Sequence, residues 1–213
     1  MPEAHNSQTR HNNADLDLLL ELGKEAGQIA LRYFKKDPQT WMKQGDSPVT
    51  EADFAVDSFL KKNLLEARPD YGWLSEETED NLERMETKRT FVVDPIDGTR
   101  GFINGMKRWC ISIAIVEDNR PTAGVLECPV MKETIAASAA SGALVNGNPI
   151  QSKNLEHTSV LNVAGPRSIG REFAELVEQE VKIVPFVPSL AYRLAMIAMG
   201  QIDLSLARGS AKD

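Results

Sequence analysis

The chain has few cysteines, no excess of positive charge and no long apolar run, and each of these absences excludes a class of protein. Only Cys110 and Cys128 occur in 213 residues, without the Cys-x-x-Cys or Cys/His spacing of a zinc site, so we expect reduced core thiols. The 24 basic residues are outnumbered by 31 acidic ones, and this net charge of −7 disfavours binding of a nucleic-acid polymer. No stretch approaches the ~18 apolar residues of a membrane span.

Targeting signals and several common catalytic motifs are missing as well. Residues 1–14 are polar and lack the apolar core of a signal peptide, which predicts a disordered tail and a cytoplasmic protein with no membrane partner. The sequence contains no GxxxxGK[ST], EF-hand, GxSxG or HExxH motif. The activity must therefore be sought in another group of residues.

The pattern that is present is that of a mixed α/β globule, with 42% hydrophobic residues. We expect an N-terminal α+β lobe over residues 15–150 and a C-terminal α/β lobe over residues 151–213, which share a cleft because no Gly/Ser linker separates them. Stretch 78–89 could be helix or loop. The apolar periodicity predicts helices at 15–34, 50–67, 172–179 and 190–199, an antiparallel meander at 110–117, 122–127, 134–138 and 143–146, and further strands at 160–164 and 183–187.

The most informative stretch is the hexapeptide from Asp94 to Thr99, DPIDGT, which follows the apolar run FVV. A short buried strand is predicted to stop at Asp94, which places two carboxylates and a glycine at its carboxyl end, where ligands often bind. The alternative is a simple tight turn, because Pro, Asp and Gly all suit turn positions.

Two further acidic clusters make a simple turn the less favoured interpretation. Glu76 and Glu77 follow an apolar pair, and Asp53 lies in the first turn of the helix that Thr50 is predicted to start. Asp53 could instead only complement the positive end of that helix, a stabilisation of about 0.3–1 kcal/mol.

Together these residues predict a metal and phosphate site. Magnesium prefers oxygen ligands, and two ions about 3.5–4 Å apart can clamp a phosphoryl group and activate water. If a helix begins at Gly98-Thr99, its free N–H groups would bind phosphate. The Thr99 hydroxyl could hold the attacking water, with Glu76 or Asp53 orienting that hydroxyl or accepting its proton.

In these motifs the chain resembles the inositol monophosphatase superfamily, the magnesium-dependent, lithium-sensitive phosphomonoesterases. The resemblance covers nearly the whole chain after the tail. It rests on DSPVTEAD (46–53), Ser75-Glu76-Glu77, DPIDGT (94–99) with Phe102, Gly124-Val125-Leu126 with Pro129, and Gly142-Ala143 with Asn146-Gly147.

The resemblance implies a layered α-β-α-β-α sandwich, commonly a homodimer, and two or three Mg²⁺ ions per full-length site. By this resemblance Glu76, Asp94 and the Ile96 carbonyl would bind the first ion. Asp94 and Asp97 would bind the second, and Glu77 would reach a weaker third ion through water.

The same resemblance implies roles in binding and catalysis. Asp97, Gly98 and Thr99 would bind phosphate, while Thr99 and Asp53 would activate water. Apart from the resemblance, Arg167 and Ser168 in GPRS (165–168) are candidates for contact with the leaving group, and a loop with a solvated arginine is an equal alternative.

The chain departs from the family pattern at its end. The family carries a Trp-Asp-x-Ala-Ala signature whose aspartate completes the second metal site, and this sequence stops where that signature is expected, so the C-terminal lobe is expected to be truncated. Such a chain should bind one ion better than two.

The function expected from the residues and the resemblance is hydrolysis of a small phosphorylated metabolite. Inositol monophosphate is the leading substrate, with 3′(2′),5′-bisphosphate nucleotides and histidinol phosphate as alternatives, the latter two favoured by Arg100 after DPIDGT. A noncatalytic binding or regulatory protein is the alternative from another class.

Overall fold

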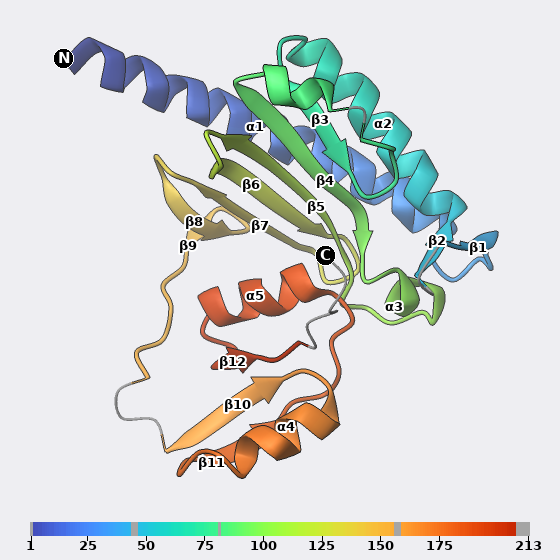
Figure 1. Cartoon of the computed structure of the whole chain (residues 1–213), viewed down its shortest axis with the longest axis vertical. Coiled ribbons are helices and arrows are strands. Elements are labelled where there is room, and N and C mark those ends of the chain that lie inside the picture. Colours follow the sequence, from blue (N-terminus) through green and yellow to red (C-terminus); the bar gives the residue numbers. More distant parts are fainter. Residues whose placement is uncertain (1, 44–46, 81, 156–158, 208–213) are drawn as a thin grey trace.

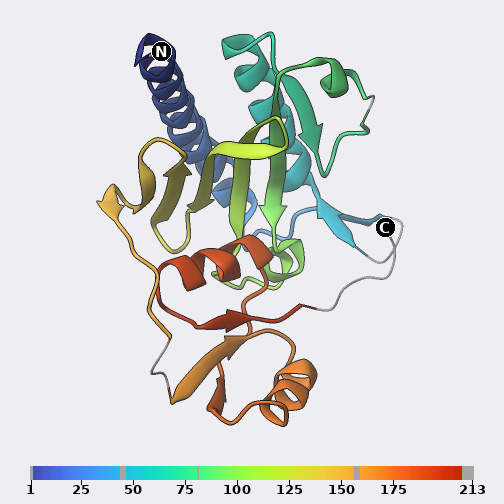
Figure 2. The same ribbon diagram turned by 60° about the vertical axis from the view of Figure 1, so that its left-hand side comes forward.

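The computed structural model describes residues 2–43, 47–80, 82–155 and 159–207. Its helices and sheets form the layers α-β-α-β-α (Figures 1 and 2). The predicted mixed α/β class and the layered sandwich are therefore confirmed. Among the described residues, no helix combines the length and the apolar character that crossing a membrane requires.

The main sheet has seven strands in the order β3-β4-β5-β6-β7-β8-β9. β3 and β4 are parallel and all other neighbours are antiparallel, which confirms the predicted meander. The strands are β3 (Gly72–Ser75), β4 (Arg89–Asp97), β5 (Cys110–Glu117), β6 (Arg120–Cys128), β7 (Glu133–Ser138), β8 (Gly142–Val145) and β9 (Asn148–Pro149).

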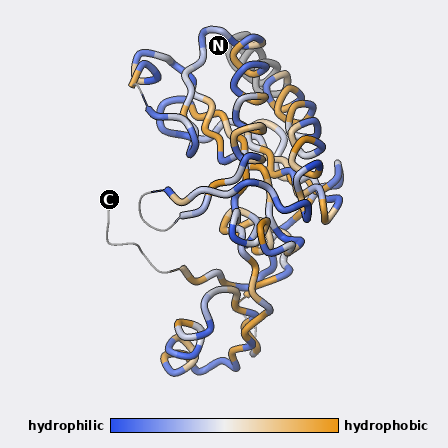
Figure 3. The backbone as a smooth tube through the Cα atoms, turned by 90° about the vertical axis from the view of Figure 1, so that its right-hand side faces the viewer, coloured by the Kyte–Doolittle hydropathy of each residue, from blue (hydrophilic) through white to orange (hydrophobic). Residues whose placement is uncertain are grey.

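Two long helices, α1 (Pro2–Tyr33) and α2 (Glu51–Ala67), cover one face of this sheet (Figure 1). Hydrophobic and hydrophilic residues alternate along them, as Figure 3 shows, and the apolar stripes form one buried core with the sheet. α1 is assigned from Pro2, and the disordered tail expected over residues 1–14 stays a prediction.

The opposite face of the main sheet is covered by α5 (Leu190–Ala198), which lies between this sheet and a second, three-stranded sheet (Figure 2). Beyond it are a parallel sheet in the order β11-β10-β12 and then α4 (Arg167–Ala174). The three strands are β11 (Glu180–Ile183), β10 (Val160–Ala164) and β12 (Leu204–Ser205). The strand was predicted at 183–187 but ends at Ile183, and the helix was predicted at 172–179 but ends at Ala174. Both predictions therefore placed the element several residues too far along the chain. Short elements with few periodic residues have poorly determined boundaries.

Four small elements complete the described part of the fold. β1 (Thr40–Met42) and β2 (Pro48–Thr50) form an antiparallel hairpin that leads into α2, and α3 (Thr99–Ile103) follows β4. In the undecided stretch 78–89, residues Glu83–Glu86 form a 3-10 helix.

The buried carboxylate of Asp15 fastens α1 to the sheet. It accepts hydrogen bonds from Arg68 Nε at 2.9 Å, from the Tyr71 hydroxyl at 2.9 Å and from Arg89 Nη1 at 2.7 Å. Asp15 is fully buried and Arg89 is nearly so. Because Arg89 begins β4, this network fixes the end of the strand that lies opposite the acidic motif.

Replacing Asp15 should therefore destabilise the fold strongly. We expect Asp15→Ala to lower the free energy of unfolding by about 3–5 kcal/mol, since it removes three hydrogen bonds and one of the two carboxylates that pair with buried Arg89. The control Asp17→Ala, at an exposed position of the same helix, should change it by less than about 0.5 kcal/mol. Urea unfolding of both variants makes the measurement, and equal effects would contradict the prediction.

Candidate active site

The candidate site is built at the end of β4. The strand was predicted to stop at Asp94 but continues to Asp97. Its pairing with β5 shifts register between Asp94 and Asp97, where Pro95 has no N–H to donate. The Asp94 carboxylate accepts a hydrogen bond from the Ile96 N–H at 3.1 Å. This irregularity makes the chain turn while keeping both carboxylates at the same edge of the sheet.

Gly98 completes the turn because no other residue fits there. Its φ of +97° lies in the left-handed region, and a Cβ at this position would come within 3.0 Å of the Ser189 backbone nitrogen. α3 begins at the next residue, Thr99, as predicted. The first N–H groups of this helix therefore follow the carboxylates directly.

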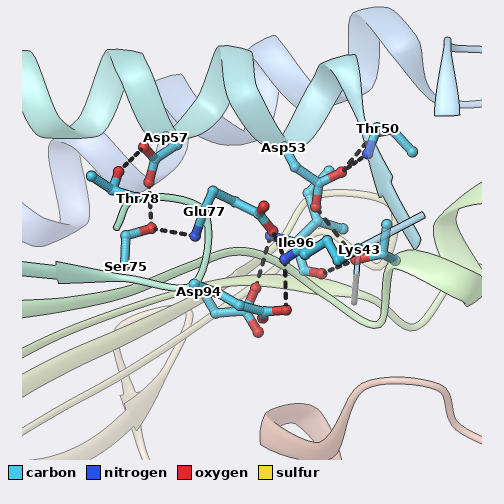
Figure 4. A network of polar contacts seen from close by, with 11 residues as sticks. Lys43, Thr50, Asp53, Asp57, Ser75, Glu77, Thr78, Asp94 and Ile96 are labelled. Carbon is cyan, nitrogen blue, oxygen red and sulfur yellow. Dashed lines mark hydrogen bonds and ion pairs between the residues drawn. The ribbon is translucent and has the colours of Figure 1, made fainter. Parts of the chain in front are cut away.

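Glu76 lies beside Asp94 because β3 and β4 are parallel neighbours that end at the same edge. The Glu76 N–H donates to the Val93 carbonyl at 3.2 Å, and the Glu76 carboxylate lies close enough to Asp94 for its charge to raise the pKa of Asp94. Figure 4 shows Asp94 below Glu77 and near Ile96. Two of the three acidic clusters thus meet, as the sequence predicted.

Asp53 brings the third cluster to the same place. It completes a capping box at the start of α2, in which its Oδ2 accepts from the Thr50 N–H at 2.8 Å and the Thr50 hydroxyl at 2.6 Å. Its other oxygen, Oδ1, accepts from the Thr99 hydroxyl at 3.3 Å. The same hydroxyl also lies 2.9 Å from the Ile96 carbonyl oxygen. Capping and contact with Thr99 therefore occur together, so the two explanations offered for Asp53 do not exclude each other.

Lys43 reaches into the acidic group from the β1–β2 hairpin. Its Nζ lies 3.0 Å from Glu76 Oε1 and 2.6 Å from Glu77 Oε1 (Figure 4). The Glu77 side chain is 4% exposed, whereas that of Glu76 is 49% exposed. Sequence analysis did not identify Lys43 as part of this group, because nothing near it in the chain indicates its partners.

A second acidic residue of α2, Asp57, supports Glu77. Its oxygens accept from the hydroxyl of Ser75 and, at 2.7 Å, from that of Thr78, and Ser75 Oγ in turn accepts from the Glu77 N–H at 3.2 Å (Figure 4). Sequence analysis did not identify Asp57. Its spacing of four residues from Asp53, on the same helix face, was an available signal.

Asp97 makes contacts that the sequence did not predict. Its carboxylate accepts from the Ser189 hydroxyl at 2.5 Å and from the Ala191 N–H at 2.6 Å, so it lies against the start of α5. More than ninety residues separate these groups in the chain. Asp97 thereby joins the main sheet to the helix that lies between the two sheets.

Arg167 and Ser168 lie apart from this group. Both are exposed at the start of α4, in the outermost layer of the sandwich, whereas the carboxylates lie at the end of β4 (Figure 1). A role for them in binding the leaving group stays a prediction.

Burial and mutual repulsion shape the acidity of the site. The pKa of Asp94 is raised to about 9, first by burial and then by the charges of Glu76 and Asp97. Burial also raises the pKa of Asp53, against the hydrogen bonds from Thr50. Burial likewise raises the pKa of Glu77, although Lys43 opposes this shift. The metal-free site therefore holds more carboxylate charge than it can accommodate, and Asp94 keeps a proton at neutral pH.

The donor set fits magnesium chemically, although the described side chains are not yet arranged around an ion. Among the described residues, no three His, Cys, Asp or Glu side chains form a group that could hold a metal ion as they stand. Lys43 contacts Glu76 and Glu77, and Asp97 is bonded to α5. The available donors are carboxylate and carbonyl oxygens, which magnesium prefers, and excess negative charge is the condition that a divalent cation relieves.

Comparison with known proteins agrees with the fold. Residues 12–213 match the sequence pattern of the inositol monophosphatase family. The chain therefore belongs to the inositol monophosphatase family, whose members are generally dependent on metal ions. Two parts of the predicted pattern lie outside the described residues: Asp46, the first residue of the motif DSPVTEAD, and residues 208–213 at the end of the predicted C-terminal lobe.

Individual relatives carry different names. The chain is 35% identical over 150 residues to a histidinol-phosphatase of Chlorobaculum parvum, covering 70% of this chain and 57% of that protein. It is 29% identical over 200 residues to an inositol monophosphatase of Dictyostelium discoideum, covering 88% and 74%. The chain thus spans between about half and three quarters of the length of the curated relatives it matches.

Solved structures show the same fold. The IMPase of Thermotoga maritima superimposes with a TM-score of 0.76 at 26% identity, over 89% of this chain and 74% of that one. A staphylococcal inositol monophosphatase gives a TM-score of 0.78 at 17% identity, over 90% and 73%, which supports the fold alone.

Magnesium binding at neutral pH should release protons. Asp94 holds a proton below its raised pKa of about 9, and a cation bound to its carboxylate would displace that proton. Calorimetric titration at pH 7 in buffers of different ionisation enthalpy should show release of about one proton per bound ion. The release should vanish above pH 10, and binding without proton release at pH 7 would contradict the assigned protonation.

Proposed function

We propose that the chain carries the metal-binding and water-activating part of a magnesium-dependent phosphomonoesterase, which hydrolyses a small phosphorylated metabolite. The observation that supports this most strongly is the convergence of Glu76, Asp94 and Asp53 from three separate stretches beside the start of α3. Family membership supports the same class of reaction.

In this proposal Glu76, Asp94 and the Ile96 carbonyl hold a first magnesium ion, and Asp94 and Asp97 hold a second. Glu77 reaches a third, weaker ion through water. When bound, these ions supply Lewis-acid stabilisation of phosphoryl charge and lower the pKa of a bound water. Asp97 would have to exchange its hydrogen bonds to α5 for such a ligand role.

The chain's own groups hold the water and move its proton. The Thr99 hydroxyl can pass its proton to Asp53 Oδ1, at 3.3 Å, while its oxygen accepts a proton from the attacking water. Thr50 keeps Asp53 oriented through the two capping hydrogen bonds. Asp53 suits a base because burial raises its pKa toward the working range. Free N–H groups at Gly98 and Thr99 would bind the phosphate oxygens.

Inositol monophosphate is the leading substrate, and histidinol phosphate is the second candidate. The second is favoured by Arg100, which follows DPIDGT, and by the name of the Chlorobaculum parvum relative. We further propose a cytoplasmic homodimer, by analogy with the family. A 3′(2′),5′-bisphosphate nucleotide is a third substrate to be tested.

Phosphate release should identify the substrate. We expect magnesium-dependent release from one of the three compounds at a kcat/KM at least about tenfold above the other two, because a site that hydrogen-bonds its substrate discriminates strongly against analogues. A generic aryl phosphate should be hydrolysed more slowly. If none of the four is hydrolysed with magnesium present, the noncatalytic alternative is favoured.

Replacing Asp94 should separate catalysis from stability. We expect Asp94→Asn to lower kcat/KM more than about a hundredfold, since even groups that only support a metal ligand cost about 10–100-fold. Without metal at pH 8, the same variant should be more stable than the parent, because folding must keep the Asp94 carboxyl protonated and this cost grows as pH rises from about 4 toward 9.

The matched control is Asp118→Asn, in the exposed β5–β6 turn, where Asn tolerates the positive φ equally well. It should leave both turnover and metal-free stability unchanged. A fully active Asp94→Asn protein would contradict the proposed function.

A further inference from the structure

The Lys43 ammonium lies against Glu76 and Glu77, two of the carboxylates that are proposed to bind metal ions. Its ammonium lies 3.0 Å from Glu76 Oε1 and 2.6 Å from Glu77 Oε1. Its backbone N–H donates to the Ser47 carbonyl at 2.8 Å, which holds the residue at the mouth of the β1–β2 hairpin. Figure 4 shows the side chain directed into the same group as Asp53 and Ile96.

We propose that Lys43 is a built-in counter-ion that competes with magnesium for Glu76 and Glu77. It stabilises the metal-free chain, and a bound ion displaces its ammonium from the Glu76 oxygen. The proposal rests on the proposed function, because it requires that Glu76 bind a metal. Lys43 is therefore a positioning residue rather than a catalytic one.

Simultaneous contact of both cations with Glu76 Oε1 is unfavourable on distance alone. Magnesium lies about 2.0–2.1 Å from its oxygen ligands. The Lys43 ammonium is 3.0 Å from the same oxygen, so the two positive charges would be no more than about 5 Å apart. Their repulsion in a partly buried site is substantial. The ion pair with Glu76 and a metal at Glu76 are thus alternative states.

The ion pair of Lys43 with Glu77 is stronger than its ion pair with Glu76, because Glu77 is the more buried of the two glutamates. The Lys43 and Glu77 side chains are 26% and 4% exposed, so their contact is much less screened than the contact with half-exposed Glu76. The ammonium bridges Glu76 and Glu77 and relieves the repulsion between the two carboxylates.

The test is calorimetric titration of magnesium into the metal-free chain and its Lys43→Gln variant. We expect magnesium to bind Lys43→Gln about five- to tenfold more tightly, because no ammonium must be displaced; this ratio corresponds to about 1–1.4 kcal/mol. In EDTA the variant should melt at a lower temperature than the parent. Its rise in melting temperature on adding magnesium should be larger.

Two controls separate this effect from general electrostatics. Lys62→Gln removes the same charge from an exposed position of α2 and should leave the magnesium affinity within about twofold. Lys43→Arg keeps the charge and should bind magnesium as the parent does or more weakly.

Unchanged or weaker magnesium binding by Lys43→Gln would overturn the proposal, because it would mean that Lys43 supports the metal-bound state or is irrelevant to it. If the variant does not fold in EDTA, recovery of folding with magnesium supports the proposal, and failure to recover overturns it. If the parent itself binds no magnesium, the proposed function fails. If the parent binds magnesium and Lys43→Gln binds it equally well, only the proposal for Lys43 fails.

Discussion

The structure depends on gathering several carboxylates at one edge of a buried sheet, where they repel one another. Burial and the neighbouring charges raise the pKa of Asp94 so far that it is protonated at neutral pH. Lys43 offsets part of the remaining charge on Glu76 and Glu77. The metal-free fold therefore tolerates the site only through a bound proton and an internal ammonium. Binding of a divalent cation relieves the same repulsion.

Each carboxylate also has a structural partner that holds it in place. Asp53 caps α2, Asp94 accepts from the N–H of its own turn, and Asp97 accepts from the start of α5. Helix N-termini and turn N–H groups favour negative charge, so the fold recovers part of the cost of burying these acids. The side chains of the candidate site thus also stabilise the fold, so a substitution there is expected to change stability as well as any activity.

Much of the fold around the candidate site could be predicted from the sequence, because the residue patterns that determine it lie within a few positions of one another. The meander follows from alternation and turn residues, and the Thr50/Asp53 capping box and the start of α3 at Thr99 follow from residue types a few positions apart. The longer reach of β4 was not predictable, because its last residues are held by pairing with β5 after a shift of register.

The contacts that could not be predicted are those that join distant segments. No residue near Asp97 in the sequence predicts its hydrogen bond with Ser189, and no residue near Lys43 predicts its ion pair with Glu77. Both contacts bring a second element to the acidic group: Ser189 belongs to α5 between the sheets, and Lys43 to the hairpin before α2. The hairpin contacts Glu76 and Glu77, whereas the start of α5 contacts Asp97. The acidic group is therefore held from two sides, by a hairpin that precedes α2 and by a helix from the other end of the chain.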